Sequence, residues 1–303
     1  MAQIFHITLL VLISILPALF LLWFFEKQDK GEKEPRKLKN KIFLWGIITT
    51  IIAAGLEINL ESIIPKGTPS WLYLFLIAFV VTAFIEEGLK FWVVKKQAWS
   101  HEKFNEIMDG ITYAVIAGLG FAVLENLLYV LQEGMVTGIV RAVFAVPAHA
   151  LFSGIMGYYI GKAKFEKTPW DTRSTLWKGF GIAVLYHGLY DFFLMSESWM
   201  WVLVIPLMIF MAMQLKYLIN KARFEDKVQK SKPSVFDFKR GLKIVSATLF
   251  VVVGVLSLAG TILAVSEESS TYRTIDILYS AIFALILFAI AYFIIRKKGI
   301  AKK

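Results

Sequence analysis

Long uninterrupted apolar runs restrict the fold of this chain more than any other feature of its sequence. A helix needs about 20 mostly apolar residues to cross the ~30 Å hydrocarbon core of a bilayer. We identify nine such runs, at about 4–25, 42–64, 71–94, 109–131, 139–161, 177–195, 199–219, 242–265 and 275–295. Because backbone polar groups in lipid must be satisfied within the spanning element, the sequence predicts an all-α, polytopic transmembrane helix bundle of about nine spans.

The placement of basic residues predicts how this bundle is oriented. Of the 33 Lys and Arg residues, 29 fall in the segments 26–41, 95–108, 162–178, 216–243 and 296–303. These segments are every second loop of the predicted bundle, together with the C-terminal tail. The positive-inside rule then predicts an N-terminus outside the cell and a cytoplasmic C-terminus, in a bacterial-type cell membrane.

The composition excludes some classes of partner and site. The net charge of +10 does not indicate a nucleic-acid partner, because the basic residues lie in short topology-determining loops and not in a soluble module. The chain has no cysteine, which excludes disulfides and thiolate metal sites. The expected surroundings are the lipid bilayer, and the sequence does not predict an oligomeric state.

The predicted spans divide into four segments. Residues 1–64 hold two N-terminal spans, and residues 65–219 form a core of about five spans. A polar cytoplasmic linker at 220–241 separates this core from a two-span hairpin with a basic tail at 242–303. The core is predicted to be catalytic, because it contains all the polar motifs described below.

Ionisable residues inside spans are the strongest indication of function. Each costs about 2.5–3.5 kcal/mol at the bilayer centre on insertion scales. The third to sixth spans nevertheless carry seven of them: Glu86, Glu87, Lys90, Glu125, His149, His187 and Asp191. We expect these side chains to converge and pair around one solvated interior, which makes a functional site the favoured interpretation over a purely structural one.

Helical spacing supports this convergence. Glu86 and Lys90 are four residues apart, in the order that favours an ion pair, whereas Glu87 points about 100° away around the helix. His187 and Asp191 share a face for the same reason. One carboxylate of the Glu pair is therefore expected to meet Lys90 while the other is available to a different partner.

Two further spans are expected to direct polar groups into the bundle. In the fourth, small residues recur every four positions, at Gly110, Ala114, Gly118 and Ala122. Such faces let helices approach closely in lipid, and Glu125 extends this face. In the fifth, Pro147 removes a backbone hydrogen bond near His149 and is expected to kink the helix.

These residue types suit peptide hydrolysis. A carboxylate in a poorly solvated site serves as a general base toward water, and an imidazole or a protonated acid can donate to the oxyanion. No Gly-x-Ser-x-Gly or His-Glu-x-x-His motif occurs, which argues against a serine hydrolase or a zincin. The candidate catalytic residues are Glu86, Glu87, Glu125, His149, His187 and Asp191.

The motifs resemble those of one family. The segment 84–90, Phe-Ile-Glu-Glu-Gly-Leu-Lys, resembles the Glu-Glu-x-x-Lys motif of PrsW-type intramembrane proteases. Residues 108–111 and 120–126 are similar to that family's Asp-Gly and Phe-x-x-x-Glu-Asn elements. Its later His and His-x-x-x-Asp elements have counterparts in 147–149 and 187–191. The resemblance covers about residues 70–195 and places the chain near the CAAX prenyl endopeptidase group.

The resemblance implies roles for individual residues. It implies that Glu86 activates water, that Glu87 with Lys90 supports it, and that His187 with Asp191 lines the oxyanion side. Asp109 and Asn126, with Lys90, are supporting positions. Prenyl endopeptidases have His where this chain has Glu125, which favours the PrsW branch. The implied substrate is a single-pass membrane protein, and the resemblance points to an anti-sigma factor in regulated proteolysis.

Several alternatives stay open at this point. The same charges would suit an ion- or proton-coupled transporter, although no paired halves are seen, and a non-catalytic scaffold could keep the motif. Glutamate-activated water needs no metal, so no cofactor is predicted; Zn²⁺ held by Glu125, His149 and His187 is the alternative. Glu57 and Glu61 are interpreted as interface residues.

Overall fold

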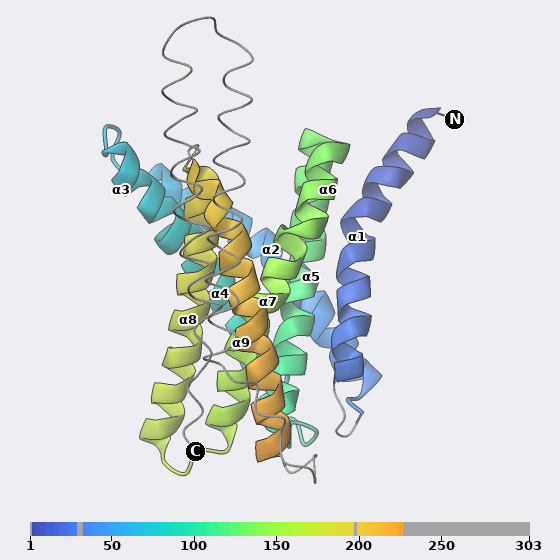
Figure 1. The fold of residues 1–303 in the computed structure, drawn as a ribbon, viewed down its shortest axis with the longest axis vertical. Coiled ribbons are helices and arrows are strands. Elements are labelled where there is room, and N and C mark those ends of the chain that lie inside the picture. The colour runs from blue at the N-terminus through green and yellow to red at the C-terminus, as the bar shows by residue number, and fades with distance from the viewer. Residues whose placement is uncertain (1, 29–32, 197–198, 227–303) are drawn as a thin grey trace, which may run out of the picture. The chain divides into compact units, whose positions relative to one another are not determined.

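The structure is a computed structural model that describes residues 2–28, 33–196 and 199–226. All regular elements in this part are helical (Figure 1). They are α1 (Ala2–Gln28), α2 (Arg36–Ser62), α3 (Ser70–Phe75), the π-helical η1 (Leu76–Ala83), α4 (Phe84–Gln97), α5 (Ile107–Glu133), α6 (Met135–Val143), α7 (Ala145–Lys164), α8 (Pro169–Met195), the 3₁₀ segment η2 (Trp199–Leu203) and α9 (Val204–Glu225).

Six helical stretches are long and apolar enough to cross a membrane. They are Ile7–Lys27, Arg36–Ser62, Ser70–Gln97, Ile107–Glu133, Met135–Lys164 and Trp199–Glu225. α8 has the length, but charged residues such as Arg173, Lys178 and Asp191 interrupt it, and it is not among the six. The all-helical, multi-pass architecture is thus confirmed, whereas the total of nine spans and the orientation of the termini stay predictions.

The chain divides into two compact units. Residues up to Ser196 and 214–226 belong to the first unit, which contains every predicted site residue. Residues 199–213 belong to the second and form η2 and the first part of α9. The two predicted spans at 242–265 and 275–295 lie outside the described residues, and the predicted domain boundaries are not tested.

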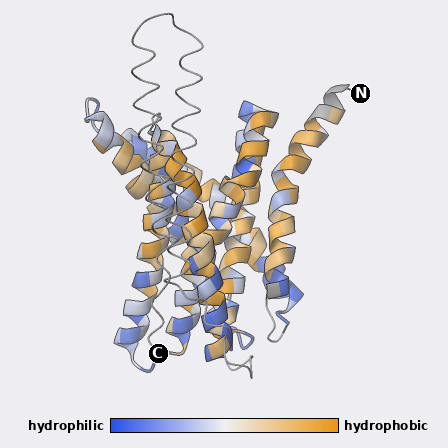
Figure 2. Ribbon diagram, viewed as in Figure 1, coloured by the Kyte–Doolittle hydropathy of each residue, from blue (hydrophilic) through white to orange (hydrophobic). Residues whose placement is uncertain are grey.

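In the first unit, α5 lies at the centre. It packs against α7, α2, α1 and α4, and α8 packs against α7 and η1. The small-residue face of α5 contacts α7: a side chain at Gly110 would collide with the Gly157 carbonyl, and one at Gly118 would collide with Ser153. Figure 2 shows apolar residues along most of α1.

Two irregularities interrupt the helices that carry the site. α6 ends at Val143, four residues before Pro147, and α7 begins at Ala145. Pro147 has no N–H for the Val143 carbonyl, and its ring crowds that carbonyl, so the predicted kink occurs there. In the third span, the π-helical turns of η1 lie directly before α4. Such segments are rare and often occur at functional sites.

Candidate active site

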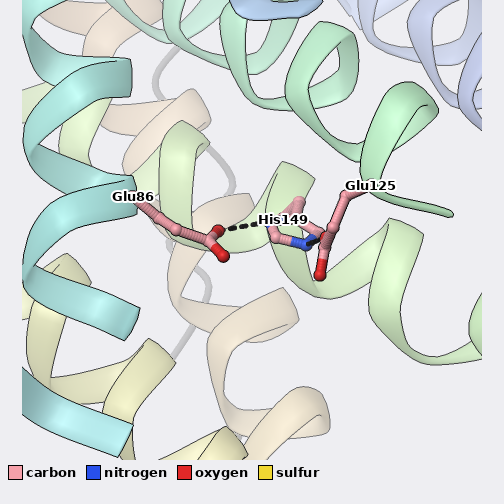
Figure 3. A group of neighbouring side chains, drawn as sticks. All are labelled: Glu86, Glu125 and His149. Atoms are coloured by element: carbon pink, nitrogen blue, oxygen red, sulfur yellow. Dashed lines mark hydrogen bonds and ion pairs between the residues drawn. The ribbon is translucent and has the colours of Figure 1, made fainter. Parts of the chain in front are cut away.

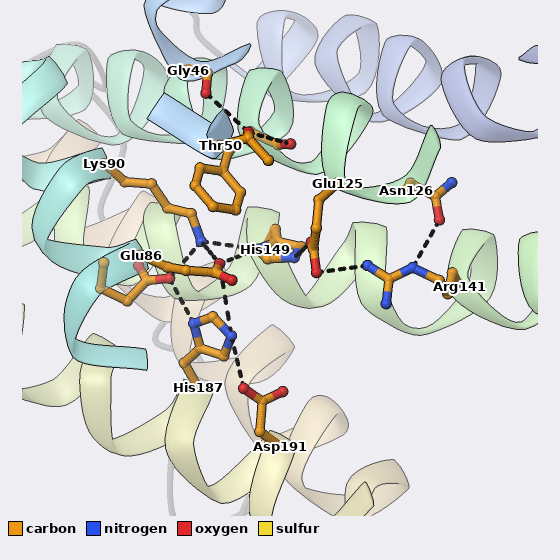
Figure 4. Close-up of polar contacts among 12 residues, drawn as sticks. Gly46, Thr50, Glu86, Lys90, Glu125, Asn126, Arg141, His149, His187 and Asp191 are labelled. Carbon is orange, nitrogen blue, oxygen red and sulfur yellow. Dashed lines mark hydrogen bonds and ion pairs between the residues drawn. The ribbon is translucent and has the colours of Figure 1, made fainter. Parts of the chain in front are cut away.

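A cluster of charged side chains lies inside the first unit. We define the charge cluster as Glu86, Glu87 and Lys90 of α4, Glu125 of α5, Arg141 of α6, His149 of α7, and His187 and Asp191 of α8 (Figure 4). Glu86, Glu87 and Lys90 are at most 4% exposed. The cluster brings together side chains that are up to about a hundred residues apart in the sequence.

Lys90 is the centre of the cluster. Its ammonium donates to Glu86 Oε2 at 2.9 Å and to Glu87 Oε1 at 2.8 Å, and it lies 3.0 Å from His149 Nδ1. An ammonium has three donors and no acceptor, so these three contacts use all of its hydrogens. The Phe121 ring packs 4.3 Å from Nζ. Lys90 therefore neutralises part of the charge of the Glu pair and fixes its position.

The contact with Lys90 also determines the tautomer of His149. Because Nδ1 must accept from Lys90, the ring proton belongs on Nε2, which donates to Glu125 Oε2 at 2.7 Å (Figure 3). Arg141 pairs with the other oxygen of Glu125 at 2.9 Å. Asn126 in turn accepts from Arg141 Nε at 3.1 Å. His149 is thus oriented by a chain of polar contacts that ends at a buried amide.

His187 occupies the other side of the Glu pair. Its Nδ1 lies 3.0 Å from Glu87 Oε1, and its Nε2 lies 3.3 Å from Asp191 Oδ2. Its ring stacks on Phe152, with ring centroids 4.7 Å apart and planes 16° apart. Both nitrogens therefore face carboxylates, and the ring orientation is restricted by an apolar surface as well.

Backbone contacts hold the helices of the site in register. Thr50 of α2 donates to the Phe121 carbonyl at 3.1 Å and so ties α2 to the part of α5 that packs on Lys90 (Figure 4). Asn126 donates to the Ser14 carbonyl of α1 at 3.1 Å. These bonds satisfy polar groups that lipid cannot satisfy.

Of the predicted site residues, all but one come together in or beside the cluster. Asn126 contacts it through Arg141, as described above. Asp109 does not: it lies near the start of α5, 16 residues or about 24 Å of helix from Glu125. There its Oδ2 accepts from the backbone N–H groups of Asn105 and Glu106, each at 2.8 Å. Its observed contacts are those of a helix cap.

Two residues near the cluster are not among the predicted site residues. Arg141 lies near the start of the predicted span 139–161, and Glu57 is interpreted from the sequence as an interface residue. Glu57 interacts electrostatically with Glu86 and Glu125, and its Oε1 is buried without a hydrogen-bond partner among the described residues. Its position could have been found from spacing, because residue 57 continues the buried face that Gly46, Thr50 and Ala53 form on α2.

The cluster has an excess of negative charge. Four carboxylates, those of Glu86, Glu87, Glu125 and Asp191, face two permanent cations, Lys90 and Arg141. The two remaining negative charges would be costly in a dry interior. A protonated imidazole or a bound cation would offset them.

Two overlapping groups of donors could hold such a cation. Glu86, Glu125 and His149 offer ligand atoms within 4.8 Å of one another (Figure 3), and so do Glu86, Glu87 and His187. Imidazole and carboxylate donors are those of catalytic zinc sites. Glu87 Oε2 is also buried with no hydrogen-bond partner among the described residues. The donor chemistry therefore fits a divalent ion, although Lys90 already contacts donors of both groups.

Comparison with known proteins identifies the family. Residues 34–215 match the model of the PrsW family intramembrane metalloproteases. A protein named Protease PrsW from Geobacillus kaustophilus is 37% identical over 193 residues, which cover 63% of this chain and 82% of that protein. Proteins of the same name from Clostridioides difficile and Bacillus subtilis are 34% and 33% identical, over 75% and 65% of this chain and 94% and 88% of theirs.

No solved structure gives a significant match. The family match covers more than half of the chain and includes α2 to α8, on which most of the charge cluster and its supports lie. The relatives are named as proteases, so the transporter and scaffold alternatives are not retained. The chain therefore belongs to the PrsW family of intramembrane proteases, and it is a multi-pass membrane enzyme.

Proposed function

We propose that the charge cluster hydrolyses a peptide bond of a membrane-anchored, single-pass protein with a water molecule activated by a carboxylate. The observation that carries this proposal is the position of Glu86. Its Oε2 lies 4.0 Å from His149 Nδ1 and 4.0 Å from His187 Nε2. These separations are too long for direct hydrogen bonds. Because His149 Nδ1 already accepts from Lys90, the space suits a water held between the Glu86 carboxylate and the His187 imidazole.

Glu86 is assigned as the general base. It takes a proton from the water as the water oxygen bonds to the carbonyl carbon of the substrate, and the carbonyl oxygen becomes an oxyanion. His187 donates to that oxyanion, since its Nε2 faces the same space. Glu86 then returns the proton to the amide nitrogen as the carbon–nitrogen bond breaks. General base catalysis of this kind contributes about 10²–10⁴-fold in rate.

The other members of the charge cluster are assigned as orienting groups. Glu87 contacts both Lys90 and His187, so it couples the helix that carries the base to the helix that carries the oxyanion donor. Glu125 fixes the tautomer of His149, and Asp191 faces Nε2 of His187. A site whose groups are held in place before substrate binds needs little reorganisation during the reaction.

The family description implies a metal, and the donors fit one. Glu86, Glu125 and His149, or Glu86, Glu87 and His187, would hold it. A bound divalent ion would supply Lewis-acid polarisation of the carbonyl and a lower pKa for water. The carboxylate mechanism above requires only this chain's own residues.

The proposed substrate class follows from family membership and from the burial of the site. The cluster lies on helices of a membrane protein, so a substrate segment that itself lies in the bilayer is at the same depth as the cluster. We propose a membrane-anchored anti-sigma factor as the physiological example, cleaved as part of regulated proteolysis. Co-expression with a tagged library of single-pass proteins, comparing the native chain with Glu87→Gln, would identify it through fragments that appear only with the native chain.

Reporter cleavage by the purified enzyme tests the assignment of the base. Glu86→Gln is nearly isosteric and keeps the packing of α4, so we expect a loss of about 10²–10⁴-fold in cleavage rate with unchanged expression. The matched control is Glu102→Gln, at an exposed position in the loop after α4, which should cleave at the native rate. If both Glu86→Gln and Glu87→Gln cleave like the native enzyme, the proposed mechanism is wrong.

A further inference from the structure

A groove of about 560 Å³ lies between α4 and α8, outside the charge cluster. From α4 it is lined by Phe84, Gly88, Phe91 and Lys95, and from α8 by residues between Pro169 and Phe180. We call it the α4–α8 groove. Its volume is within the range of about 300–1,000 Å³ that is typical of ligand pockets.

The groove is separate from the charge cluster because it uses another face of α4. The four α4 residues that line it recur at intervals of four, three and four positions, which places them on one helical face. Glu86 is about 170° from the centre of that face. Phe84 and Trp177, which line the groove, are 52% and 62% exposed. The groove is therefore open to the surroundings, which for a membrane protein include lipid.

The length of the groove corresponds to one leaflet. Phe84 and Lys95 are eleven residues apart, which is about 16 Å along a helix. This is half of the ~30 Å hydrocarbon thickness. The rings of Phe84 and Phe91 pack along the groove against Phe180, with centroid separations of 5.2 and 6.1 Å. A bound chain would thus lie along these rings, within one leaflet.

The lining of the groove suits an acyl chain. Between Phe84 and Lys95 the lining is mostly apolar, with Gly88 and Phe91 from α4 and Leu176, Trp177 and Phe180 from α8. A hydrocarbon chain gains dispersion contacts against such side chains and needs no hydrogen-bond partner from them.

The charges at one end specify the head group. Among the described residues that line the groove, Lys95 and Arg173 are cations and none is an acid. Neither forms an ion pair within the described part of the chain; Lys95 Nζ lies over the Trp99 ring, and Lys164 adds further positive charge nearby. These residues adjoin loops 95–108 and 162–178, which are predicted to be cytoplasmic. Basic pockets between transmembrane helices bind anionic lipid head groups.

We propose that the α4–α8 groove binds one anionic phospholipid, with an acyl chain between the aromatic side chains and the phosphate between Lys95 and Arg173. Such a lipid joins the helix that carries Glu87 to the helix that carries His187. It therefore stabilises the pairing of these helices from outside the charge cluster. This inference does not depend on the catalytic mechanism, because it rests only on the shape and charge of the groove.

Lipid retention tests the proposal. The full-length protein is exchanged into vesicles of phosphatidylcholine with one quarter phosphatidylglycerol, extracted in mild detergent, and analysed by native mass spectrometry. We expect one retained phosphatidylglycerol per chain and a higher thermal midpoint than in pure phosphatidylcholine. A basic residue near an anionic surface contributes about fivefold to binding, so Lys95→Gln with Arg173→Gln should weaken retention by about 30-fold.

Two comparisons make the test specific. Lys96→Gln with Lys178→Gln removes the same charge from the same helices, outside the groove, and should retain phosphatidylglycerol like the native chain. Thr172→Phe keeps both cations but fills the groove, and should lose the lipid. The proposal is overturned if phosphatidylcholine is retained equally, if the Lys96/Lys178 variant loses as much lipid as the Lys95/Arg173 variant, or if Thr172→Phe binds normally.

Discussion

The two faces of α4 have different kinds of neighbour. The inward face carries part of the charge cluster, where each ionised group contacts a partner from another turn or another helix. The outward face lines the α4–α8 groove with aromatic side chains and ends in Lys95, which forms no ion pair with the residues that the structure describes. Substitutions should therefore have large, coupled effects on the inward face and small, separable effects on the outward one.

The largest expected effect is that of removing the central cation. Lys90→Met leaves the Glu86 and Glu87 carboxylates without their shared partner in a buried position. Breaking a buried pair in this way costs about 3–5 kcal/mol, measured as a lower free energy of unfolding in detergent. Lys96→Met, on the exposed side of the same helix, should change stability by less than about 0.5 kcal/mol.

A second substitution distinguishes lost charge pairing from lost packing. If the cost of Lys90→Met comes from uncompensated carboxylates, adding Glu87→Gln should recover part of it, because one buried negative charge is then removed. Equal destabilisation by Lys90→Met and Lys96→Met would show that the two faces of α4 do not differ in this respect.

The next largest effect concerns the two imidazoles. Glu125→Gln weakens the charged hydrogen bond to His149, a bond worth about 1.5–3 kcal/mol, and Asp191→Asn removes the charge that lies 3.3 Å from His187 Nε2. We expect cleavage rates about 10- to 150-fold lower than the native rate, with little change in folding. The measurement is initial cleavage rate at saturating reporter, with Glu133→Gln at the exposed end of α5 as the control. Native rates for both Glu125→Gln and Asp191→Asn would contradict the orienting role.

A substitution on the outward face should have a much smaller effect. Phe91→Leu is nearly volume-conserving and contacts no member of the charge cluster, so we expect a stability change below about 1.5 kcal/mol. The cleavage rate should stay within about twofold of the native value. A loss of cleavage comparable to that of Glu125→Gln would mean that the two faces of α4 are functionally coupled.

The smallest effect is expected from metal removal. If Glu86 activates water directly, dialysis against a strong chelator should leave the cleavage rate unchanged, and added Zn²⁺ should not raise it. Inactivation by the chelator, reversed by Zn²⁺, would instead assign the Glu86, Glu125 and His149 donors or the Glu86, Glu87 and His187 donors to a metal.

Much of this fold could be predicted from the sequence, because a helix that crosses a bilayer must be long, mostly apolar and internally hydrogen-bonded. Apolar runs of sufficient length predict spans, and six of the described stretches meet that description. His187 and Asp191 lower the hydropathy of α8, and in the structure both side chains turn toward the charge cluster. The spacing of Gly110 and Gly118 predicted a face that another helix approaches closely, and the structure shows that this helix is α7.

Arg141 and Asp109 show what apolar runs and short motifs do not predict. Arg141 is near the start of a predicted span, where a cation has an ordinary explanation as an interface residue. Its role appears only when α6 brings it 2.9 Å from Glu125. Asp109 is the opposite case, because a motif position was grouped with the site, whereas the structure places it near the start of α5, where it accepts from the backbone N–H groups of Asn105 and Glu106.

The sequence by itself determined that this chain is helical and membrane-embedded, and that its costly intramembrane charges must find one another. Those conclusions depend on the free-energy cost of placing polar groups in hydrocarbon, and this cost does not depend on which helix carries the residue. Only the tertiary structure decided which charges meet, because Lys90 contacts Glu86, Glu87 and His149 together. It also decided that the opposite face of α4 lines a groove. Pairing depends on distances of a few ångströms between helices, and spacing along one helix does not specify them.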